Sequence, residues 1–268
     1  MNVSDTITAA ILGVIEGLTE FLPVSSTAHV LIAGEVLGFH STGHAFEVVI
    51  QLGAVLAIIG LYGARLAQVF CAAPHDPQAR RFIYSVLLAF APAVVIGVMA
   101  HDIIKTVLFD SPKLIASMLI IGGAILIIVD RMKITVRHED AMHVPLHKAL
   151  VIGFVQCLAM IPGTSRSGAT IVSAMLMGVS KRAAAEFSFF LSIPTMTGAF
   201  AYDLYKNRDI LSTGDMGLIA VGFATAFVSA IFVVKWLLGF LSQHGYTVFG
   251  VWRIFLGLLI FAYFALYT

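Results

Sequence analysis

Six apolar stretches, most of about twenty residues or more, dominate this sequence and restrict what the chain can fold into. A helix needs about 20 mostly apolar residues to cross the roughly 30 Å hydrocarbon core of a bilayer. The stretches are 45–70, 82–100, 114–130, 183–204, 216–238 and 247–267. We therefore predict an all-α polytopic membrane protein with six transmembrane helices, in one membrane domain covering residues 1–268.

The composition excludes most other classes of protein. Only 12% of the residues are charged, 16 Lys and Arg against 15 Asp and Glu, whereas 59% are hydrophobic. Soluble domains average about 25% charged residues, and a nucleic-acid binder needs a basic surface. The two cysteines, Cys71 and Cys157, lie among apolar neighbours and give no disulfide or metal-ligand spacing.

Two further apolar regions are interrupted by polar residues. One is broken by FLPVSSTAH at 21–29 and the other by PGTSRSG at 162–168, and each half is too short to span a bilayer. Irregular backbone at membrane depth is tolerated only where protein or a watery cavity surrounds it. Both regions are therefore predicted to be re-entrant helix hairpins.

The two broken regions resemble each other in sequence. The matched pairs are Gly13 with Gly153 and Glu16 with Gln156, 140 apart, and, after a one-residue slip, Pro23 with Pro162 and Ser26 with Ser165, 139 apart. In the predicted topology the first hairpin enters from outside and the second from the cytoplasm. This indicates an inverted repeat of about 1–130 and 140–268, an arrangement typical of secondary transporters.

The basic residues predict the orientation of the chain. Of the 16 Lys and Arg, ten fall on one side of the predicted topology, and Arg166 is placed within the membrane. The other side holds five: Lys105, Lys113, Lys206, Arg208 and Arg253. Because positive charge is retained on the cytoplasmic side, both termini are predicted to be extracytoplasmic.

The first hairpin carries two carboxylates at bilayer depth. Glu16 and Glu20 are one helical turn apart and share a face. Ionisable groups inside a membrane are expensive and are functional candidates by default. The pair suits general acid/base chemistry or a divalent cation.

Hydroxyl groups and a histidine follow these carboxylates. Ser25, Ser26 and Thr27 come directly after Pro23, where a helix N-terminus binds phosphate oxygens readily. His29 lies one turn further on, on the same face as the serines, and is a candidate base for a hydroxyl nucleophile.

The second hairpin repeats the hydroxyl groups and adds a cation. Its candidate substrate-binding residues are Gly163, Thr164, Ser165, Ser167 and Gly168. Between them, Arg166 offers a fork that matches phosphate geometry. A structural salt bridge from Arg166 to Glu20 is the alternative interpretation.

The two motifs carry a resemblance to a known family. EGLTEFLPVSSTAH (Glu16–His29) and PGTSRSGAT (Pro162–Thr170) resemble the signatures of the bacterial undecaprenyl-diphosphatase family, also called bacitracin resistance proteins. FEVVIQLG, AAEFSFFLS and DLYK extend the resemblance along the chain. One departure is Ala28, where the family commonly has Gly; it leaves the polar positions intact.

The resemblance implies hydrolysis of undecaprenyl diphosphate to undecaprenyl phosphate and inorganic phosphate in the bacterial plasma membrane. It implies the functional set Glu16, Glu20, Ser26, His29 and Arg166, in a site open to the periplasm. It also implies a divalent cation, Mg or Ca, with Glu16 and Glu20 as tentative ligands.

Some alternatives stay open at this stage. Attack by Ser26, with His29 or Glu20 as base, competes with attack by a carboxylate-activated water. A transporter or flippase of an anionic polyprenyl lipid is the rival function, because inverted repeats and broken helices belong mainly to transporters. The partners expected are the lipid substrate and the bilayer, without nucleic acid, and a homodimer is left open.

Overall fold

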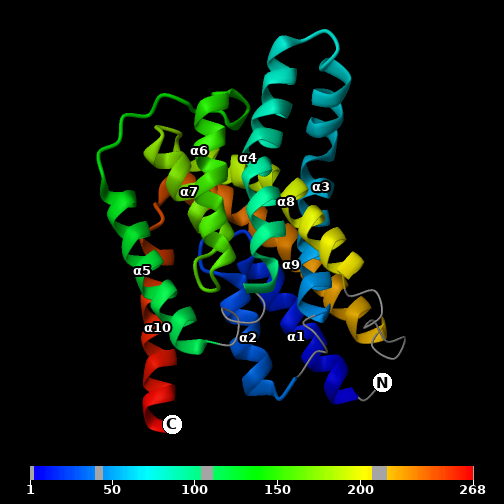
Figure 1. Cartoon of the computed structure of the whole chain (residues 1–268), viewed down its shortest axis with the longest axis vertical. Coiled ribbons are helices and arrows are strands. Elements are labelled where there is room, and N and C mark those ends of the chain that lie inside the picture. Colours follow the sequence, from blue (N-terminus) through cyan, green and yellow to red (C-terminus); the bar gives the residue numbers. More distant parts are fainter. Residues whose placement is uncertain (1–2, 40–44, 104–110, 207–215, 268) are drawn as a thin grey trace.

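The protein is built from helices. The computed structural model describes residues 3–39, 45–103, 111–206 and 216–267, and within these ranges the only strand-like pairing is an isolated bridge between His138 and Val179. The elements are α1 (Val3–Thr19), α2 (Ser26–Leu37), α3 (Ala45–Ala72), α4 (Pro77–Ile103), α5 (Pro112–Arg131), η3 (Ala141–His143), α6 (Leu146–Gln156), η4 (Cys157–Met160), α7 (Arg166–Leu176), α8 (Lys181–Lys206), α9 (Met216–Gln243) and α10 (Thr247–Tyr267) (Figure 1). The prediction of an all-α chain is confirmed.

Five helices in the described part of the chain are long and apolar enough to cross a membrane: α3, α4, α5, α9 and α10. They coincide with five of the six predicted transmembrane stretches. The last of them, α10, packs along α5, and the two helices run side by side on one flank of the molecule (Figure 1).

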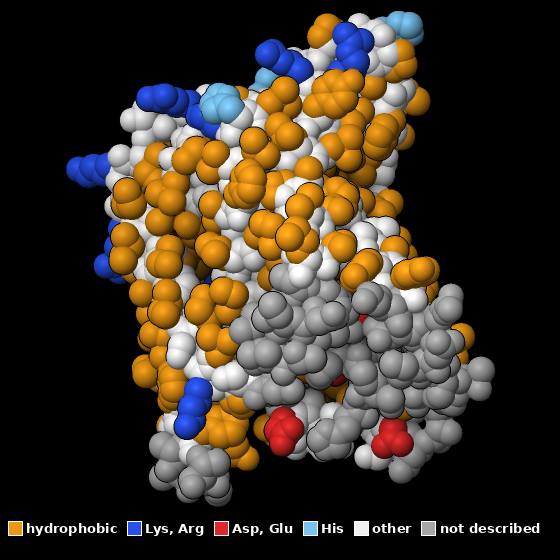
Figure 2. Space-filling model, in the orientation of Figure 1, with side chains coloured by type: hydrophobic (Ala, Val, Ile, Leu, Met, Phe, Trp, Pro, Cys, Tyr) orange, Lys and Arg blue, Asp and Glu red, His pale blue; other side chains and the backbone are white. Residues whose placement is uncertain are grey.

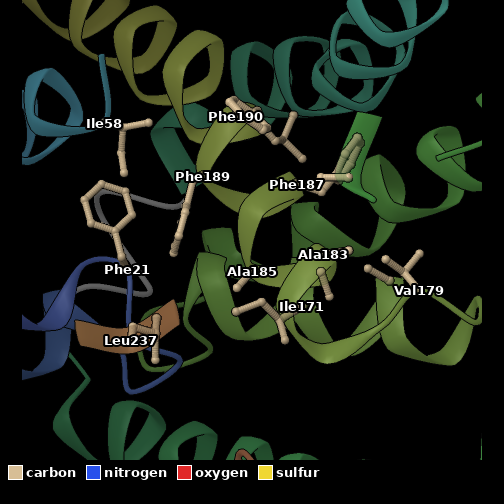
Figure 3. Close-up of a cluster of buried hydrophobic side chains, with 14 of the residues drawn as sticks. Phe21, Ile58, Ile171, Val179, Ala183, Ala185, Phe187, Phe189, Phe190 and Leu237 are labelled. Atoms are coloured by element: carbon tan, nitrogen blue, oxygen red, sulfur yellow. The ribbon is translucent and has the colours of Figure 1, made fainter. Parts of the chain in front are cut away.

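The sixth predicted stretch, 183–204, forms α8, which differs from the other five. It is long enough to span but is less apolar, and its buried residues include Glu186. Residues 183–191 are all buried, and the ring of Phe189 packs edge-on against Phe21 at 5.4 Å between centroids (Figure 3). The first half of α8 is therefore enclosed by protein, which explains why it tolerates polar side chains.

Both helix breaks fall at the predicted residues. Residues 20–25 separate α1 from α2, and residues 161–165 separate η4 from α7. Pro23 and Pro162 lack a backbone N–H and disfavour helical backbone in the residue before them. The helices after the breaks have 12 and 11 residues, or about 17–18 Å at 1.5 Å per residue, well short of a bilayer core.

The two halves of the chain interlock through closely packed helices. The helix α1 packs on α9, and in the same way α6 packs on α4. A Cβ atom at Gly13 of α1 would overlap the carbonyl group of Gly222 in α9, and one at Gly153 of α6 would overlap the backbone of Ala89 in α4. Glycine at these positions lets the first helix of each broken region lie directly against the opposite half.

The surface matches the polarity of a bilayer. Apolar side chains cover most of the described face along the helices, and Lys and Arg gather at the end that holds the α3–α4 turn (Figure 2). The exposed apolar residues include Trp252, Phe255 and Leu259 on α10. Exposed basic residues include Arg80 and Arg81 near the start of α4 and Arg137 between α5 and η3.

Candidate active site

In each broken region, a serine with positive φ comes directly before the second helix. Ser25 (φ 71°) precedes α2 and Ser165 (φ 74°) precedes α7, and no other non-glycine residue in the described ranges has a positive φ. Such conformations are uncommon and cluster at functional sites. The Ser165 Oγ accepts a hydrogen bond from the Gly168 N–H at 3.1 Å, whereas the Ser25 side chain makes no cap bond.

These serines correct the predicted alignment of the two regions. Ser25 and Ser165 occupy the same place and are 140 residues apart, so Ser26 corresponds to Arg166 and not to Ser165. We call residues 20–25 the first tip and residues 161–165 the second tip. The second tip has one more residue between its proline and the following helix than the first. Gly163 in the second tip has a φ of 91°, a conformation that favours glycine.

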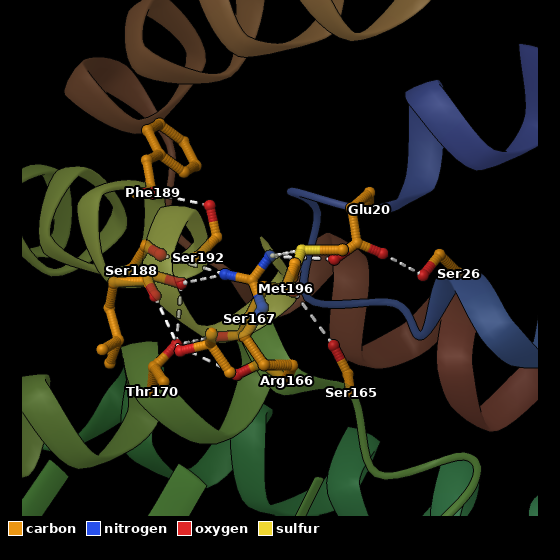
Figure 4. Close-up of polar contacts among 12 residues, drawn as sticks. Glu20, Ser26, Ser165, Arg166, Ser167, Thr170, Ser188, Phe189, Ser192 and Met196 are labelled. Carbon is orange, nitrogen blue, oxygen red and sulfur yellow. Dashed lines mark hydrogen bonds and ion pairs between the residues drawn. The ribbon is translucent and has the colours of Figure 1, made fainter. Parts of the chain in front are cut away.

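A carboxylate joins the two helix starts. Arg166 Nη2 donates to Glu20 Oε1 at 2.8 Å, and the Ser26 hydroxyl donates to Glu20 Oε2 (Figure 4). Glu20 and Ser26 are each 7% exposed. A cation, a carboxylate and a hydroxyl group thus lie together in a water-poor setting, where charge-assisted hydrogen bonds are strong.

The guanidinium of Arg166 is held in place by α8. Its Nη1 donates to the carbonyl oxygen of Ser188 at 3.0 Å and to that residue's hydroxyl oxygen at 3.3 Å, and Nη2 lies 3.3 Å from the Met196 sulfur (Figure 4). The ring of Phe21 lies 5.9 Å below the guanidinium carbon. The Arg166 Nε atom is buried without a hydrogen-bond partner, so this donor is available to a ligand.

Glu16 is the more enclosed of the two carboxylates. It is 1% exposed, lies one turn before Glu20 on α1, and its Oε1 atom has no hydrogen-bond partner. A buried carboxylate oxygen without a partner carries a large desolvation cost. A bound cation or a proton would remove that cost.

The remaining hydroxyl groups beside the two breaks divide into two kinds. Ser165 and Ser167 have their oxygens 3.0 Å apart, and the Ser167 hydroxyl donates to the carbonyl oxygen of Leu22 in the first hairpin at 2.7 Å. Ser167 thus joins the second tip to the first, and Ser165 contacts Ser167 and Gly168 within its own region. The Thr164 hydroxyl is buried without a partner, and Thr27 is half-buried in the first turn of α2.

His29 is not brought to Ser26 in this structure. Its Nδ1 lies 2.8 Å from the Ser25 carbonyl oxygen, and its Nε2 accepts a hydrogen bond from the Trp252 indole N–H at 2.8 Å. A ring nitrogen facing a carbonyl oxygen carries hydrogen, and the one facing an indole N–H does not. Both nitrogens are therefore engaged, and the ring is neutral.

Arg253 does not lie where the sequence predicts it. The charge count predicts it on the outer side of the membrane, but it lies inside α10 and is 1% exposed. Of the other four residues assigned to that side, Lys105 and Arg208 lie outside the described residues. The signal was present, because an ionisable residue within an apolar span is a functional candidate by default.

No sequence pattern indicates the contacts of Ser188 and Met196 with Arg166, or that of Trp252 with His29. Each of these contacts joins residues far apart in the sequence.

Comparison with known proteins assigns a family. The family model described as "Bacitracin resistance protein BacA" matches residues 9–259. A Cereibacter sphaeroides protein named undecaprenyl-diphosphatase is 65% identical over 257 residues, 96% of each chain. Proteins of the same name from Paracoccus denitrificans and Caulobacter vibrioides are 64% and 58% identical, each over 94% of this chain and 95% of the relative. The chain belongs to the family of the bacitracin resistance protein BacA.

Proposed function

We propose that this multi-pass membrane protein hydrolyses undecaprenyl diphosphate to undecaprenyl phosphate and inorganic phosphate. This reaction recycles the lipid carrier of cell-wall synthesis and confers resistance to bacitracin. Support comes from relatives named undecaprenyl-diphosphatase that match nearly the whole chain. The observation that carries the chemistry is the contact of Glu20 with both Ser26 and Arg166.

In the proposed reaction Ser26 is the nucleophile. Its Oγ bonds to the terminal phosphorus, the bond from that phosphorus to the bridging oxygen breaks, and undecaprenyl phosphate leaves with the bridging oxygen. Glu20 accepts the hydroxyl proton, since Ser26 already donates to its Oε2 atom, and releases it to solvent. Water then attacks the phosphoserine, and one of its protons returns to Ser26 Oγ as inorganic phosphate departs.

Charge on the phosphoryl oxygens is stabilised by the second hairpin. Arg166 has an unpartnered buried Nε donor, and Thr164 has an unpartnered buried hydroxyl. The N-terminal turns of α2 and α7 add backbone N–H groups, which favour anions. Electrostatic stabilisation of this kind supplies most of the catalysis in phosphoryl transfer.

We assign the base role to Glu20 in preference to His29. For His29 to take the proton, Trp252 has to release the Nε2 atom. Glu20 needs no such change, because its hydrogen bond from Ser26 is already made. Attack by a carboxylate-activated water is the competing route.

A divalent cation, Mg or Ca, belongs to the proposal. The free Oε1 of Glu16 suits it, although two carboxylates are fewer than the six or so oxygens that such a cation prefers. Within the described residues no group of three or more His, Cys, Asp or Glu could hold a metal. Glu16 would hold the cation through its free Oε1 atom. A ligand role for Glu20 is the alternative to its role as base, because both of its oxygens already accept hydrogen bonds, from Ser26 and Arg166. When bound, the cation neutralises charge on the diphosphate.

The proposed architecture is an inverted repeat of about 1–130 and 140–268. It has six transmembrane helices, α8 being the sixth, two re-entrant hairpins, and a site that faces the periplasm. The reciprocal packing of α1 on α9 and of α6 on α4 supports the repeat. Because Arg253 is buried, it no longer counts among the basic residues on the outer side. The excess of Lys and Arg on the predicted cytoplasmic side is therefore larger, which supports extracytoplasmic termini.

The orientation can be tested with an impermeant thiol reagent in intact cells. Exposed Cys71 near the end of α3 should react only after permeabilisation. In a variant without Cys71 and Cys157, a cysteine at Val3 should react before permeabilisation and a cysteine at Arg137 only after it. The opposite pattern would invert the topology.

The function is tested by phosphate release from detergent-purified protein given a long-chain polyprenyl diphosphate, with and without a chelator. We expect release that stops in the Ser26→Ala variant and falls when the chelator is present. A flippase without phosphatase activity would release no phosphate. Detergent removes the bilayer, so lipid transport cannot contribute to the signal. Absence of release by the wild-type protein would contradict the proposal.

A further inference from the structure

Arg253 is fully buried and is bonded only to backbone. Its guanidinium reaches five carbonyl oxygens: Nε to Leu119 at 3.4 Å, Nη1 to Pro23 at 3.2 Å, and Nη2 to Met118 at 3.1 Å, Gly163 at 2.9 Å and Thr164 at 2.9 Å. Pro23 lies in the tip of the first hairpin, and Gly163 and Thr164 lie in the tip of the second. One side chain of α10 thus joins both tips to α5.

This arrangement is not a buried ion pair. No Asp or Glu in the described part of the chain forms a salt bridge with Arg253. Removing a charge from water is costly, and here only carbonyl dipoles compensate for it. An apolar side chain would avoid that cost, so the use of arginine calls for a specific reason.

The surrounding helices leave room for the guanidinium. A Cβ atom at Gly122 of α5 would overlap Nη2, and one at Gly168 of α7 would lie 3.0 Å from Nη1. Glycine at both positions allows the planar fork to lie between the helices, where its N–H groups diverge toward different segments. Lysine has a compact ammonium group with three donors and cannot reproduce this fork.

We propose that Arg253 is a positioning residue for the phosphatase reaction. It fixes the backbone three residues before Ser26 and two residues before Arg166, and so sets the distance between the two hairpin tips. This inference rests on the proposed site of Glu20, Ser26 and Arg166. Because a misplacement of about 1 Å can cost about 100-fold in rate, Arg253 governs kcat while leaving substrate binding largely intact.

The test measures kcat and KM separately for Arg253→Lys in detergent. We expect kcat to fall by about 10- to 100-fold, with KM within about threefold of wild type. Arg65→Lys is the matched control, because Arg65 bridges Asp140 and Glu186 away from the tips, and should keep its kcat. In Arg253→Ala, added guanidinium should restore part of the lost kcat by occupying the vacated space.

The outcomes separate this inference from the proposed function. Arg253→Lys with more than half the wild-type kcat would overturn the inference. So would a loss in Arg253→Ala that guanidinium does not relieve and that follows the fall in thermal stability, because that pattern marks a purely structural residue. Glu20→Gln is assayed in the same series. If Glu20→Gln stays active, the proposed site itself is wrong. If Glu20→Gln is inactive but Arg253→Lys stays active, only the proposed role of Arg253 is wrong.

Discussion

The two broken regions share a backbone design but carry opposite chemistry. Each has a proline followed by a serine with positive φ and a short helix. At equal offsets of 140, the first region has Glu16, Glu20 and Ser26 where the second has Gln156, Met160 and Arg166. The first hairpin thus supplies the carboxylates and the hydroxyl group, and the second supplies the cation.

The difference shows how two similarly built helix breaks contribute different groups to one polar cluster. Had both hairpins kept carboxylates, the tips would repel each other, since like charges at close range are destabilising. With Arg166 opposite Glu20, the tips attract each other through a 2.8 Å ion pair. The following predictions exchange or remove these differences, from the largest expected effect to the smallest.

Removing the hydroxyl group of the first hairpin should have the largest effect. Ser26→Ala should lower kcat/KM by at least about 1,000-fold, because loss of a nucleophile typically costs several orders of magnitude. Phosphate release from a polyprenyl diphosphate measures it, with Ser25→Ala as the neighbouring control. A variant that keeps more than about a tenth of the rate would end the covalent mechanism.

Replacing the cation of the second hairpin by another cation should cost about 100-fold in kcat, the scale of one lost oxyanion donor. Arg166→Lys keeps the charge but cannot contact Glu20 and Ser188 while also presenting a donor to phosphate. The same assay gives kcat, and thermal stability in detergent serves as the control for folding. Retention of more than half the rate would remove Arg166 from the site.

Making the first hairpin resemble the second should give a smaller loss. Glu16→Gln copies the residue at the matching position, Gln156. We expect kcat/KM to fall by about tenfold or more, on the scale of a lost charged contact, and the cation concentration for half-maximal activity to rise. Unchanged cation dependence would exclude Glu16 as a ligand. The control is Gln156→Glu, which makes the reverse exchange at the matching position of the second region.

Releasing His29 should have the smallest effect. Trp252→Phe removes the indole N–H that donates to His29 Nε2 but keeps an aromatic side chain at the surface. If Glu20 is the base, the rate should stay within about twofold of wild type, as for a change outside the reacting groups. A clear rise in rate that His29→Ala abolishes would instead give the base role to the histidine.

Much of the fold could be predicted because it depends on local properties. Apolar length predicted five of the helices that can cross a membrane, and the prolines and hydroxyl residues located both breaks. The helix α8 was harder to assess, since Glu186 and the enclosed first half reflect contacts with the rest of the protein. Hydropathy measures composition and not the partners of a helix.

The candidate site could be predicted only in part. The motifs pointed to Glu20, Ser26 and Arg166, which lie together across 146 residues of sequence. The partner of His29 could not be predicted, because Trp252 is 223 residues away and lies on no shared motif. Arg253 was misplaced because counting charges by side assumes that each is at a surface.

A double-mutant cycle on kcat/KM with Glu20→Gln, Ser26→Ala and the pair tests the central claim most directly. Each variant is first checked for folding by its thermal stability in detergent. If Glu20 activates Ser26, the two residues act as a unit, and the double variant should be no slower than the worse single variant by more than about threefold. Losses that multiply in the double variant would show that the two side chains act independently and would contradict the account.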